Sequence, residues 1–295
     1  MNRSGPEYAC IQGWGFFDGP TDAASVAAIK SWHTNAVRIP LNEDCWLNIN
    51  GVKPQYGGVN YQNAIINYVT LLHQNGFYVI LDLQWNAPGT QQATGLQPMP
   101  DLDHAPAFWQ SVATAFKNDP AVLFDVFNEP QFVSWGCWRD GTGCPVNWQV
   151  AGMQRLVNTI RSTGATQPIM LGGLGYSNDL TQWLAYKPSD PANALVASFH
   201  NYNFQGCTSA TCWTNQILPV AQRVPVISDE FGENDCGHAY IDAYMAWADA
   251  NGVSYLGWTW NVWDCASGPA LISNYNGTPT NFGIGLKNHL AIVNP

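Results

Sequence analysis

Short apolar runs alternate with longer amphipathic segments along the whole chain, and this alternation constrains the fold more than any other feature of the sequence. Strands that alternate with helices form parallel sheets, and eight such units close into a barrel. The pattern therefore predicts a (β/α)8 TIM barrel. The predicted strands are residues 9–13, 36–40, 77–83, 121–127, 168–173, 195–200, 224–228 and 254–260.

The segments between these runs have helical spacing of their apolar residues, and several end at Gly or Asn, as helix C-terminal caps do. No G-x-G-x-x-G motif follows the first predicted strand, which argues against a dinucleotide-binding sheet. The chain has 295 residues, close to the roughly 250 of one barrel, and no linker or low-complexity tract divides it. We expect one catalytic barrel domain over residues 1–295.

The charge balance excludes several classes of partner. The net charge is -10, from 21 acidic and 11 basic residues, so there is no basic surface for nucleic acid. No apolar run reaches the roughly 20 residues that cross a bilayer, and no signal-peptide pattern opens the chain. We expect a mature, soluble monomer with no membrane partner and no cofactor.

The eight cysteines indicate an oxidising compartment, and we expect a secreted protein. Metal binding is the alternative use of cysteine, but the sequence has no C-x-x-C motif and no Cys/His cluster. Two pairs lie close together in turn-rich segments, and the pairing of the other four cysteines is a choice that their spacing leaves open. The predicted disulfides are Cys137–Cys144, Cys207–Cys212, Cys10–Cys45 and Cys236–Cys265.

Polar side chains gather at the carboxyl ends of the predicted strands, the face where barrel active sites form. Two carboxylic acids with a guanidinium, an imidazole, a phenol and an amide favour proton transfer over metal or phosphate binding. Paired carboxylates suit glycosidic cleavage, which needs a proton donor and an anion. These residues are Arg38, Gln84, Asn128, Glu129, His200, Tyr202, Glu230 and Trp258 or Trp260.

Taken singly, most of these residues have a structural explanation. Glu129 in an Asn-Glu-Pro turn is often solvated, Glu230 is an ordinary cap or ion-pair partner, and His200 on an apolar strand is usually a core histidine. Arg38 is harder to explain in this way, because a buried guanidinium without partners is costly.

The 14 tryptophans are many for a chain of this length, and seven of them lie in or beside the predicted mouth loops. Aromatic side chains fill cores more often than they line clefts, so we expect about two to four of the seven to stack on sugar rings. The seven are Trp46, Trp85, Trp135, Trp138, Trp258, Trp260 and Trp263.

Five motifs together resemble glycoside hydrolase family 5, the cellulase-type members of clan A. They are "AVRIP", "LFDVFNEP", "SFHNY", "VISDEFGE" and "WTWNVW", spread from residue 36 to residue 263. The resemblance implies that Glu129 is the general acid/base and Glu230 the nucleophile. It also implies that Arg38 lies near the nucleophile, that Asn128 binds sugar, and that His200 and Tyr202 form the H-x-Y pair. Trp260 is similar to the family's stacking tryptophan, with Trp258 as the alternative.

Two positions need a choice or depart from the family. "SDEFGE" contains Asp229, Glu230 and Glu233, and strand alternation points Asp229 and Glu230 in opposite directions. We choose Glu230 as the nucleophile, and the family pattern agrees. Gln84 stands where the family usually has histidine in "LDLHW", and glutamine carries no titratable proton. We expect activity with altered specificity or rate.

The sequence therefore predicts a retaining β-glycoside hydrolase that cleaves a β-1,4-linked polysaccharide, an endo-β-1,4-glucanase, with its two carboxyl groups about 5 to 5.5 Å apart. An endo-β-1,4-mannanase, another hemicellulose hydrolase of the family and an exo-acting β-glycosidase are the alternatives among enzymes. A non-catalytic carbohydrate-binding barrel is the alternative from a different class, and a metal-dependent hydrolase is disfavoured because no H-x-H follows the first predicted strand.

Overall fold

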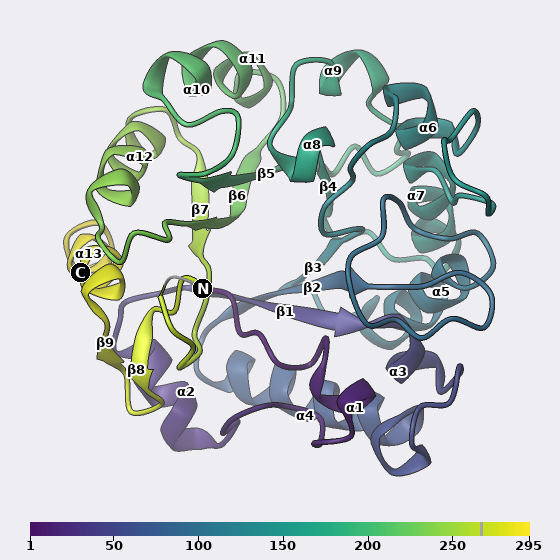
Figure 1. Cartoon of the computed structure of the whole chain (residues 1–295), viewed down its shortest axis with the longest axis horizontal. Coiled ribbons are helices and arrows are strands. Elements are labelled where there is room, and N and C mark those ends of the chain that lie inside the picture. The colour runs from purple at the N-terminus through teal and green to yellow at the C-terminus, as the bar shows by residue number, and fades with distance from the viewer. Residues whose placement is uncertain (266–267) are drawn as a thin grey trace.

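The computed structural model describes residues 1–265 and 268–295. Seven parallel strands, each hydrogen-bonded to the next in chain order, form a curled sheet at the centre of the molecule, and the helices surround it (Figure 1). The strands are β1 (Ala36–Asn42), β2 (Tyr78–Trp85), β3 (Val122–Asp125), β4 (Ile169–Gly172), β5 (Leu195–Tyr202), β6 (Val226–Gly232) and β7 (Ser254–Gly257).

The N-terminal residues take the eighth strand position, between β1 and β7 (Figure 1). On one side Asn2 pairs in parallel with Arg38, and the amide of Arg3 donates to the carbonyl of Arg38 at 2.9 Å. On the other side the amide of Asn2 donates to the carbonyl of Gly257 at 3.0 Å. The amide of Trp260 donates to the carbonyl of Asn2 at 2.9 Å. These bonds join the two edges of the sheet, and the predicted barrel architecture is confirmed.

The prediction of a first strand at residues 9–13 is wrong. Residues Ala9–Gln12 form the short helix α1, which ends at Gly13 in the left-handed region with φ of 77°. A short apolar run does not distinguish a strand from a buried helical turn. The segment that does pair, residues 1–3, has polar side chains at Asn2 and Arg3 and therefore no apolar strand signal.

The longer helices are amphipathic and pack their apolar faces on the outside of the sheet. In α7, for example, Leu156, Val157 and Ile160 are buried at helical spacing. The longer helices are α2 (Ala23–Lys30), α4 (Val59–Gln74), α5 (Ala105–Phe116), α7 (Met153–Ser162), α12 (Ala239–Ala250) and α13 (Asn281–Val293). No helix in the described part of the chain is both long enough and apolar enough to cross a membrane.

Short elements occupy many of the connections between strands and helices. They are α1 (Ala9–Gln12), α3 (Glu43–Leu47), η1 (Pro54–Tyr56), α6 (Trp135–Asp140), α8 (Leu174–Ser177), α9 (Trp183–Tyr186), α10 (Ala210–Gln216) and α11 (Leu218–Ala221). Strands β8 (Ile272–Asn274) and β9 (Thr278–Pro279) form a small antiparallel pair before α13.

Side-chain alternation divides the sheet into an outer apolar face and a layered interior. Along β2, Val79, Leu81 and Leu83 belong to the main core between sheet and helices. Ile80 instead belongs to a small separate cluster of buried apolar side chains, and the next residue of the same parity, Asp82, is a fully buried acid. One step along this strand therefore takes the interior from an apolar layer to a charged layer, where the candidate site begins.

All eight cysteines form disulfides, in the four pairs predicted from spacing. Two bridges close short loops: Cys137–Cys144 has a sequence separation of 7 residues, and Cys207–Cys212 has one of 5. The other two join separate segments: Cys10–Cys45 ties α1 to α3, and Cys236–Cys265 ties the loop after β6 to the loop after β7. The segments after the strands are thus held covalently as well as by packing.

Candidate active site

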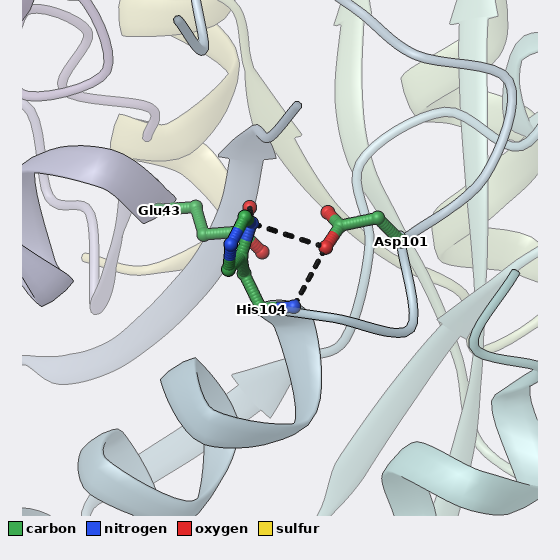
Figure 2. A group of neighbouring side chains, drawn as sticks. All are labelled: Glu43, Asp101 and His104. Carbon is green, nitrogen blue, oxygen red and sulfur yellow. Dashed lines mark hydrogen bonds and ion pairs between the residues drawn. The ribbon is translucent and has the colours of Figure 1, made fainter. Parts of the chain in front are cut away.

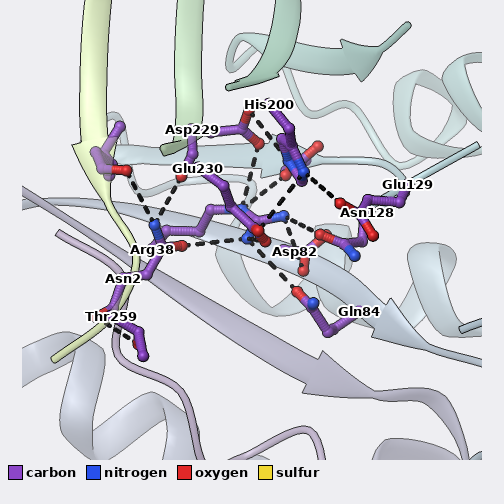
Figure 3. Close-up of polar contacts among 12 residues, drawn as sticks. Asn2, Arg38, Asp82, Gln84, Asn128, Glu129, His200, Asp229, Glu230 and Thr259 are labelled. Atoms are coloured by element: carbon purple, nitrogen blue, oxygen red, sulfur yellow. Dashed lines mark hydrogen bonds and ion pairs between the residues drawn. The ribbon is translucent and has the colours of Figure 1, made fainter. Parts of the chain in front are cut away.

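Arg38 lies at the centre of a buried polar network inside the barrel (Figure 3). Its neighbours on β1, Val37 and Ile39, pack in the outer core, so alternation along the strand turns Arg38 inward. The guanidinium donates to Oε1 of Glu230 at 2.7 Å and to Oδ1 of Asn128 at 2.9 Å. A buried cation needs such partners, because leaving it unpaired costs several kcal/mol or more.

Three aspartates complete the ring of carboxyl groups around Arg38. Oxygens of Asp125, Asp82 and Asp229 lie 2.9, 3.1 and 3.4 Å from its nitrogens. Burial raises the pKa of Asp82 to about 8 and raises the pKa of Asp125 well above its usual range. Burial opposes the charged form of Asp229 too, but His200 and Arg38 outweigh it and lower the pKa of Asp229. The charged form is therefore favoured at Asp229 and disfavoured at Asp82 and Asp125.

The carboxylate of Glu230 is held on both of its oxygens. Oε1 accepts from Arg38, and Oε2 accepts from the hydroxyl of Tyr202 at 2.7 Å. Glu230 is only 4% exposed, yet it lines the cleft at the mouth of the barrel. Burial raises the pKa of Tyr202 well above its usual range, and the Glu230 charge adds to this, so the phenol remains a donor. Glu230 is therefore held in one orientation at the cleft by donors on both of its oxygens.

Glu129, at the end of the Asn-Glu-Pro turn after β3, has a different environment. Burial raises its pKa, and the nearby charge of Glu230 acts in the same direction. His200 opposes this shift, because its Nδ1 lies 2.9 Å from Oε1 of Glu129. The result is a carboxyl group with a raised pKa that also lines the cleft. The two cleft carboxyl groups therefore have different surroundings, as an acid and an anion need.

His200 connects the two carboxylates. Burial disfavours its charged form, but Glu230, Asp229 and Glu129 outweigh burial and raise the pKa of His200 well above its usual range. Its Nδ1 lies 3.5 Å from Oε2 of Glu230, and its Nε2 lies 3.6 Å from Oδ1 of Asp229. His200 thus supplies a second buried cation beside Arg38.

Oxygens of Glu129 and Glu230 and a ring nitrogen of His200 all lie within 4.8 Å of one another. The carboxyl groups of inverting glycosidases are about 6.5 to 9.5 Å apart, to leave room for a water molecule between the general base and the sugar, whereas those of retaining enzymes are about 5 to 5.5 Å apart. The observed proximity is on the retaining side. These three residues also have the composition of a metal-ligand set, although Arg38 and His200 already balance the charge of Glu230.

Two amide side chains stand beside the carboxylates. Asn128 accepts from Arg38 through its oxygen, and its buried Nδ2 has no hydrogen-bond partner within the described residues, so it is free to donate to a ligand. Gln84 lines the cleft, and its Oε1 lies 3.5 Å from Nη1 of Arg38. Both amides contact the same guanidinium that holds Glu230.

The cleft has a volume of about 800 Å³ and one strongly aromatic wall. Trp85 and Trp263 lie with their ring centres 6.1 and 5.8 Å from that of Tyr8, and Trp258 lies 6.5 Å from Trp263. Rings of this size offer flat apolar faces that suit the C–H faces of a sugar. Trp85, Trp258 and Trp263, all predicted to bind substrate, therefore lie at the cleft together with Gln84.

Three other predicted substrate-binding tryptophans, Trp46, Trp138 and Trp260, are buried in the core, and those predictions are wrong. Trp260 is 0% exposed, with its ring packed edge-on against Trp32 at 5.0 Å. Trp46 donates to Ser111, and Trp138 donates to a carbonyl oxygen of β4. The preference for Trp260 over Trp258 is reversed, because the chain leaves β7 at Gly257 and Trp258 is the first indole beyond it.

The cleft also includes residues that the sequence reasoning did not find. Trp14 is 64% exposed at the cleft, next to Tyr8, and Tyr176 and Phe204 line another part of it. Trp14 directly follows the segment predicted as the first strand, but the sequence analysis did not include it among the mouth residues. The flanking glycines of "GWG" were the only signal for an exposed indole.

Glu233, the competing acid of "SDEFGE", does not face the cleft. It is fully buried, and its Oε2 accepts from the amide of Ile241 at 3.0 Å, in the first turn of α12. A carboxylate at a helix N-terminus is a stabilising arrangement. The structure therefore gives Glu233 a structural position. Within the described residues, the acids that line the cleft are Glu7, Glu129 and Glu230, and Glu7 accepts a hydrogen bond from the backbone amide of Gly5 at 2.6 Å.

The fold resembles solved β-glucanases. A beta-glucanase from Saccharophagus degradans in complex with cellotetraose matches with a TM-score of 0.77 at 17% identity, over 100% of this chain and 88% of that chain. An endo-beta-1,4-glucanase from Xanthomonas axonopodis pv. citri matches with a TM-score of 0.72 at 22% identity, over 100% of this chain and 98% of that chain. At these identities the likeness supports the fold alone.

The curated relatives include two kinds of polysaccharide hydrolase. Endoglucanase E-5 of Thermobifida fusca is 22% identical over 254 residues, which cover 83% of this chain and 48% of that protein. A mannan endo-1,4-beta-mannosidase of Streptomyces lividans is 25% identical over 170 residues, 54% of this chain and 41% of that protein. The matched region is thus about half the length of these relatives or less.

A family model described as cellulase (glycosyl hydrolase family 5) matches residues 3–264, nearly the whole chain. The match extends from the N-terminal segment that closes the barrel to the aromatic loop after β7. With the carboxylate pair and the parallel barrel already described, this chain belongs to glycosyl hydrolase family 5.

Proposed function

We propose that this chain is a single catalytic barrel domain, secreted and monomeric, that cleaves β-1,4-linked glucan as a retaining endo-glucanase. The observation that carries the proposal is the pairing of Glu129 and Glu230, two cleft carboxyl groups with oxygens within 4.8 Å and with different electrostatic environments. The four disulfides support secretion. The open, aromatic cleft supports a polymeric sugar substrate.

In the first step Glu230 attacks the anomeric carbon and Glu129 gives its proton to the departing glycosidic oxygen. Arg38 and Tyr202 each hold one oxygen of Glu230, which keeps the anion oriented before the attack. The raised pKa of Glu129 keeps its proton available near neutral pH. The bond to the leaving oxygen breaks as the bond to Glu230 forms.

In the second step Glu129, now ionised, takes a proton from water, and that water displaces Glu230 from the sugar. Once Glu230 is bonded to the sugar, it no longer has a negative charge. The repulsion that raised the pKa of Glu129 is then lost, so the pKa of Glu129 falls. Asn128 supplies a free amide donor for a sugar hydroxyl beside the reacting bond. Both half-reactions use the same two carboxyl groups in exchanged roles.

Mannan is the second candidate substrate. Relatives of this chain include mannan endo-1,4-beta-mannosidases from Streptomyces lividans and Cellvibrio japonicus. Glucose and mannose units differ at one hydroxyl, so the choice depends on a few polar groups at the cleft. Gln84, in place of the family's usual histidine, is one such group.

The substrate is tested with soluble β-1,4-glucan, mixed-linkage glucan, mannan and xyloglucan at equal mass. We expect the highest release of reducing ends from a glucan, with a fast fall in viscosity because internal bonds are cut. Faster release from mannan would replace the glucanase proposal with the mannanase one. Reducing ends without a viscosity loss would indicate exo-action, and no release from any substrate would favour a carbohydrate-binding barrel.

The stereochemical course follows from the proximity of the carboxyl groups. We expect the first reducing ends formed from a β-linked oligosaccharide to be the β-anomer, because two displacements at one carbon retain its configuration. Proton NMR of the anomeric signals within the first minutes, before mutarotation, measures this. Initial formation of the α-anomer would show single displacement and would contradict the double-displacement mechanism.

Three glutamine variants separate the roles of the acids. Glu230→Gln and Glu129→Gln should each lower kcat on polysaccharide by about a thousandfold or more, since each removes a group that acts in the transition state. On an aryl glycoside with an acidic phenol, Glu129→Gln should regain much of the first step, because that leaving group needs no proton. Glu230→Gln should not.

The matched control for these variants is Glu233→Gln, which alters a buried acid that does not line the cleft. It should keep turnover within a few fold even where it costs stability. Loss of turnover in Glu233→Gln, with activity kept in Glu230→Gln, would show that the nucleophile is assigned to the wrong residue.

The alkaline limb of the pH profile tests the link between His200 and Glu129. Activity needs Glu129 protonated, so kcat/KM falls as pH rises through the pKa of Glu129. His200 lowers that pKa, and His200→Asn should therefore move the alkaline limb to higher pH. His238→Asn, at an exposed pair with Asp242, is the control and should leave the limb in place. A shift to lower pH in His200→Asn would contradict the arrangement.

A further inference from the structure

A second cluster of ionisable side chains lies outside the residues that line the cleft. It consists of Glu43, Asp101 and His104 (Figure 2). Glu43 is the first residue of α3, directly after β1, while Asp101 and His104 lie at the end of the long segment between β2 and α5. We call these three residues the Glu43 cluster. Its members come from two separate connections of the barrel.

The three side chains converge on one point. Nδ1 of His104 lies 3.5 Å from Oδ1 of Asp101 and 3.9 Å from Oε1 of Glu43, and one ligand atom from each residue lies within 4.8 Å of the others. Two ligand atoms bound to one ion at about 2.0 to 2.2 Å each are no more than about 4.4 Å apart. The cluster therefore needs only small side-chain movements to bind one cation.

Glu43 is the observation that points to a ligand. Its side chain is 0% exposed, and neither of its carboxylate oxygens has a hydrogen-bond partner within the described residues. An ionised carboxylate in such a position costs several kcal/mol unless a charge compensates it. The other buried acid, Asp101, receives hydrogen bonds from the side chain of Asn86 and the amide of His104. Glu43 faces the backbone amide of Ala87 and the carboxyl group of Asp101, but neither of them meets hydrogen-bond geometry with it.

The charges of the cluster do not balance. Asp44 and Asp103 are further acids beside it, and across the described residues the basic side chain paired with Glu43, Asp101 or Asp103 is His104. Burial raises the pKa of Glu43 well above its usual range, and the neighbouring Asp101 adds to the shift. The cluster therefore needs an added positive charge, and either a cation or a proton can provide it.

We propose that the Glu43 cluster binds one divalent transition-metal ion of the zinc and manganese class. Carboxylate oxygens together with an imidazole nitrogen are ligands that these ions share, whereas calcium and magnesium prefer oxygen alone. The carbonyl oxygen of Ala87 lies 3.3 Å from Nδ1 of His104 and offers a fourth ligand atom. Oδ2 of Asp103 lies 3.9 Å from Nε2 of His104, on the side where a carboxylate orients a metal-bound histidine.

An ion in this position would be structural. It joins α3, after β1, to the segment after β2 that begins with Asn86, immediately beyond the cleft residue Trp85. Asn86 already donates to Asp101 at 2.7 Å, so fixing Asp101 also fixes the backbone next to Trp85. The metal would hold one end of the aromatic wall without contact with the carboxylate pair. This inference does not depend on the proposed substrate.

The experiment uses the full chain without a polyhistidine tag, because a tag binds the same ions. The protein is treated with a chelator and dialysed, and its thermal unfolding is then followed with zinc, manganese, calcium or magnesium ions added singly. A ligand at a hundredfold excess over its Kd should raise the Tm by roughly 5 °C for a domain of this size. We expect this rise with zinc or manganese ions, with one equivalent bound by elemental analysis.

Glu43→Gln is the test variant, since it keeps the shape of the side chain and removes its charge. It should lose the Tm response and bind at least tenfold less metal. Asp242→Asn is the matched control, because it removes a carboxylate from an exposed His–Asp pair elsewhere, and it should respond as the unaltered chain does. Cobalt ions give a second readout, with visible absorption bands that appear in the control and not in Glu43→Gln.

Three outcomes would overturn the proposal. The first is that the unaltered chain binds no zinc or manganese ion and that its Tm does not rise when these ions are added. The second is a Glu43→Gln variant that binds and responds equally. The third is a response to calcium alone, which would place the site in a different chemical class. If no metal binds and Glu43→Gln is as stable as the unaltered chain, Glu43 and Asp101 share a proton instead.

Discussion

The ion network around Arg38 is the constraint on which the rest of the structure depends. A guanidinium that is 0% exposed requires compensation, and four carboxyl groups from β2, β3 and β6 surround it. Asn2 adds an acceptor from the segment that closes the barrel. The network therefore joins strands from different parts of the ring, and it also holds Glu230, so the closure of the barrel and the orientation of this carboxylate have a common cause.

The same network gives the carboxyl groups of Glu129 and Glu230 different partners. Glu230 has Arg38 and Tyr202 on its two oxygens, whereas Glu129 has His200 as its charged neighbour and a pKa that burial raises. Two identical side chains thus acquire different hydrogen-bond partners and different charged neighbours, which suits one to act as an acid and the other as an anion. The aromatic wall of Trp85, Tyr8 and Trp263 lies beside them and shapes the space above.

Much of the architecture and several site positions were predictable, because their signals are local. Alternating apolar runs locate seven of the strands, and polar residues at strand ends locate Arg38, Glu129, His200 and Glu230. The failures were local ambiguities that only packing resolves. Residues 9–13 were expected to form the first strand, but residues 1–3 take that position. They pair through their backbone and have polar side chains, so they give no apolar strand signal.

The tryptophans show the same limit. Trp258 and Trp260 are two residues apart with the same chemistry, yet one lines the cleft and the other packs against Trp32. The buried acids Asp82 and Asp125 lie inside apolar runs of the sequence, as Arg38 does, but the pairing of both acids with Arg38 was not predictable. Side-chain partners across a barrel come from strands far apart in sequence, so no local pattern records them.

The sequence by itself determined the alternation of strands and helices, the family, the two close cysteine pairs and the acids at the strand ends, because each of these is written in residue type and spacing. The tertiary structure alone decided which indoles face the cleft, what compensates Arg38, and that Glu43, Asp101 and His104 meet. The physical reason is that burial, charge balance and ligand geometry depend on distances between chain segments, and chain closure sets those distances.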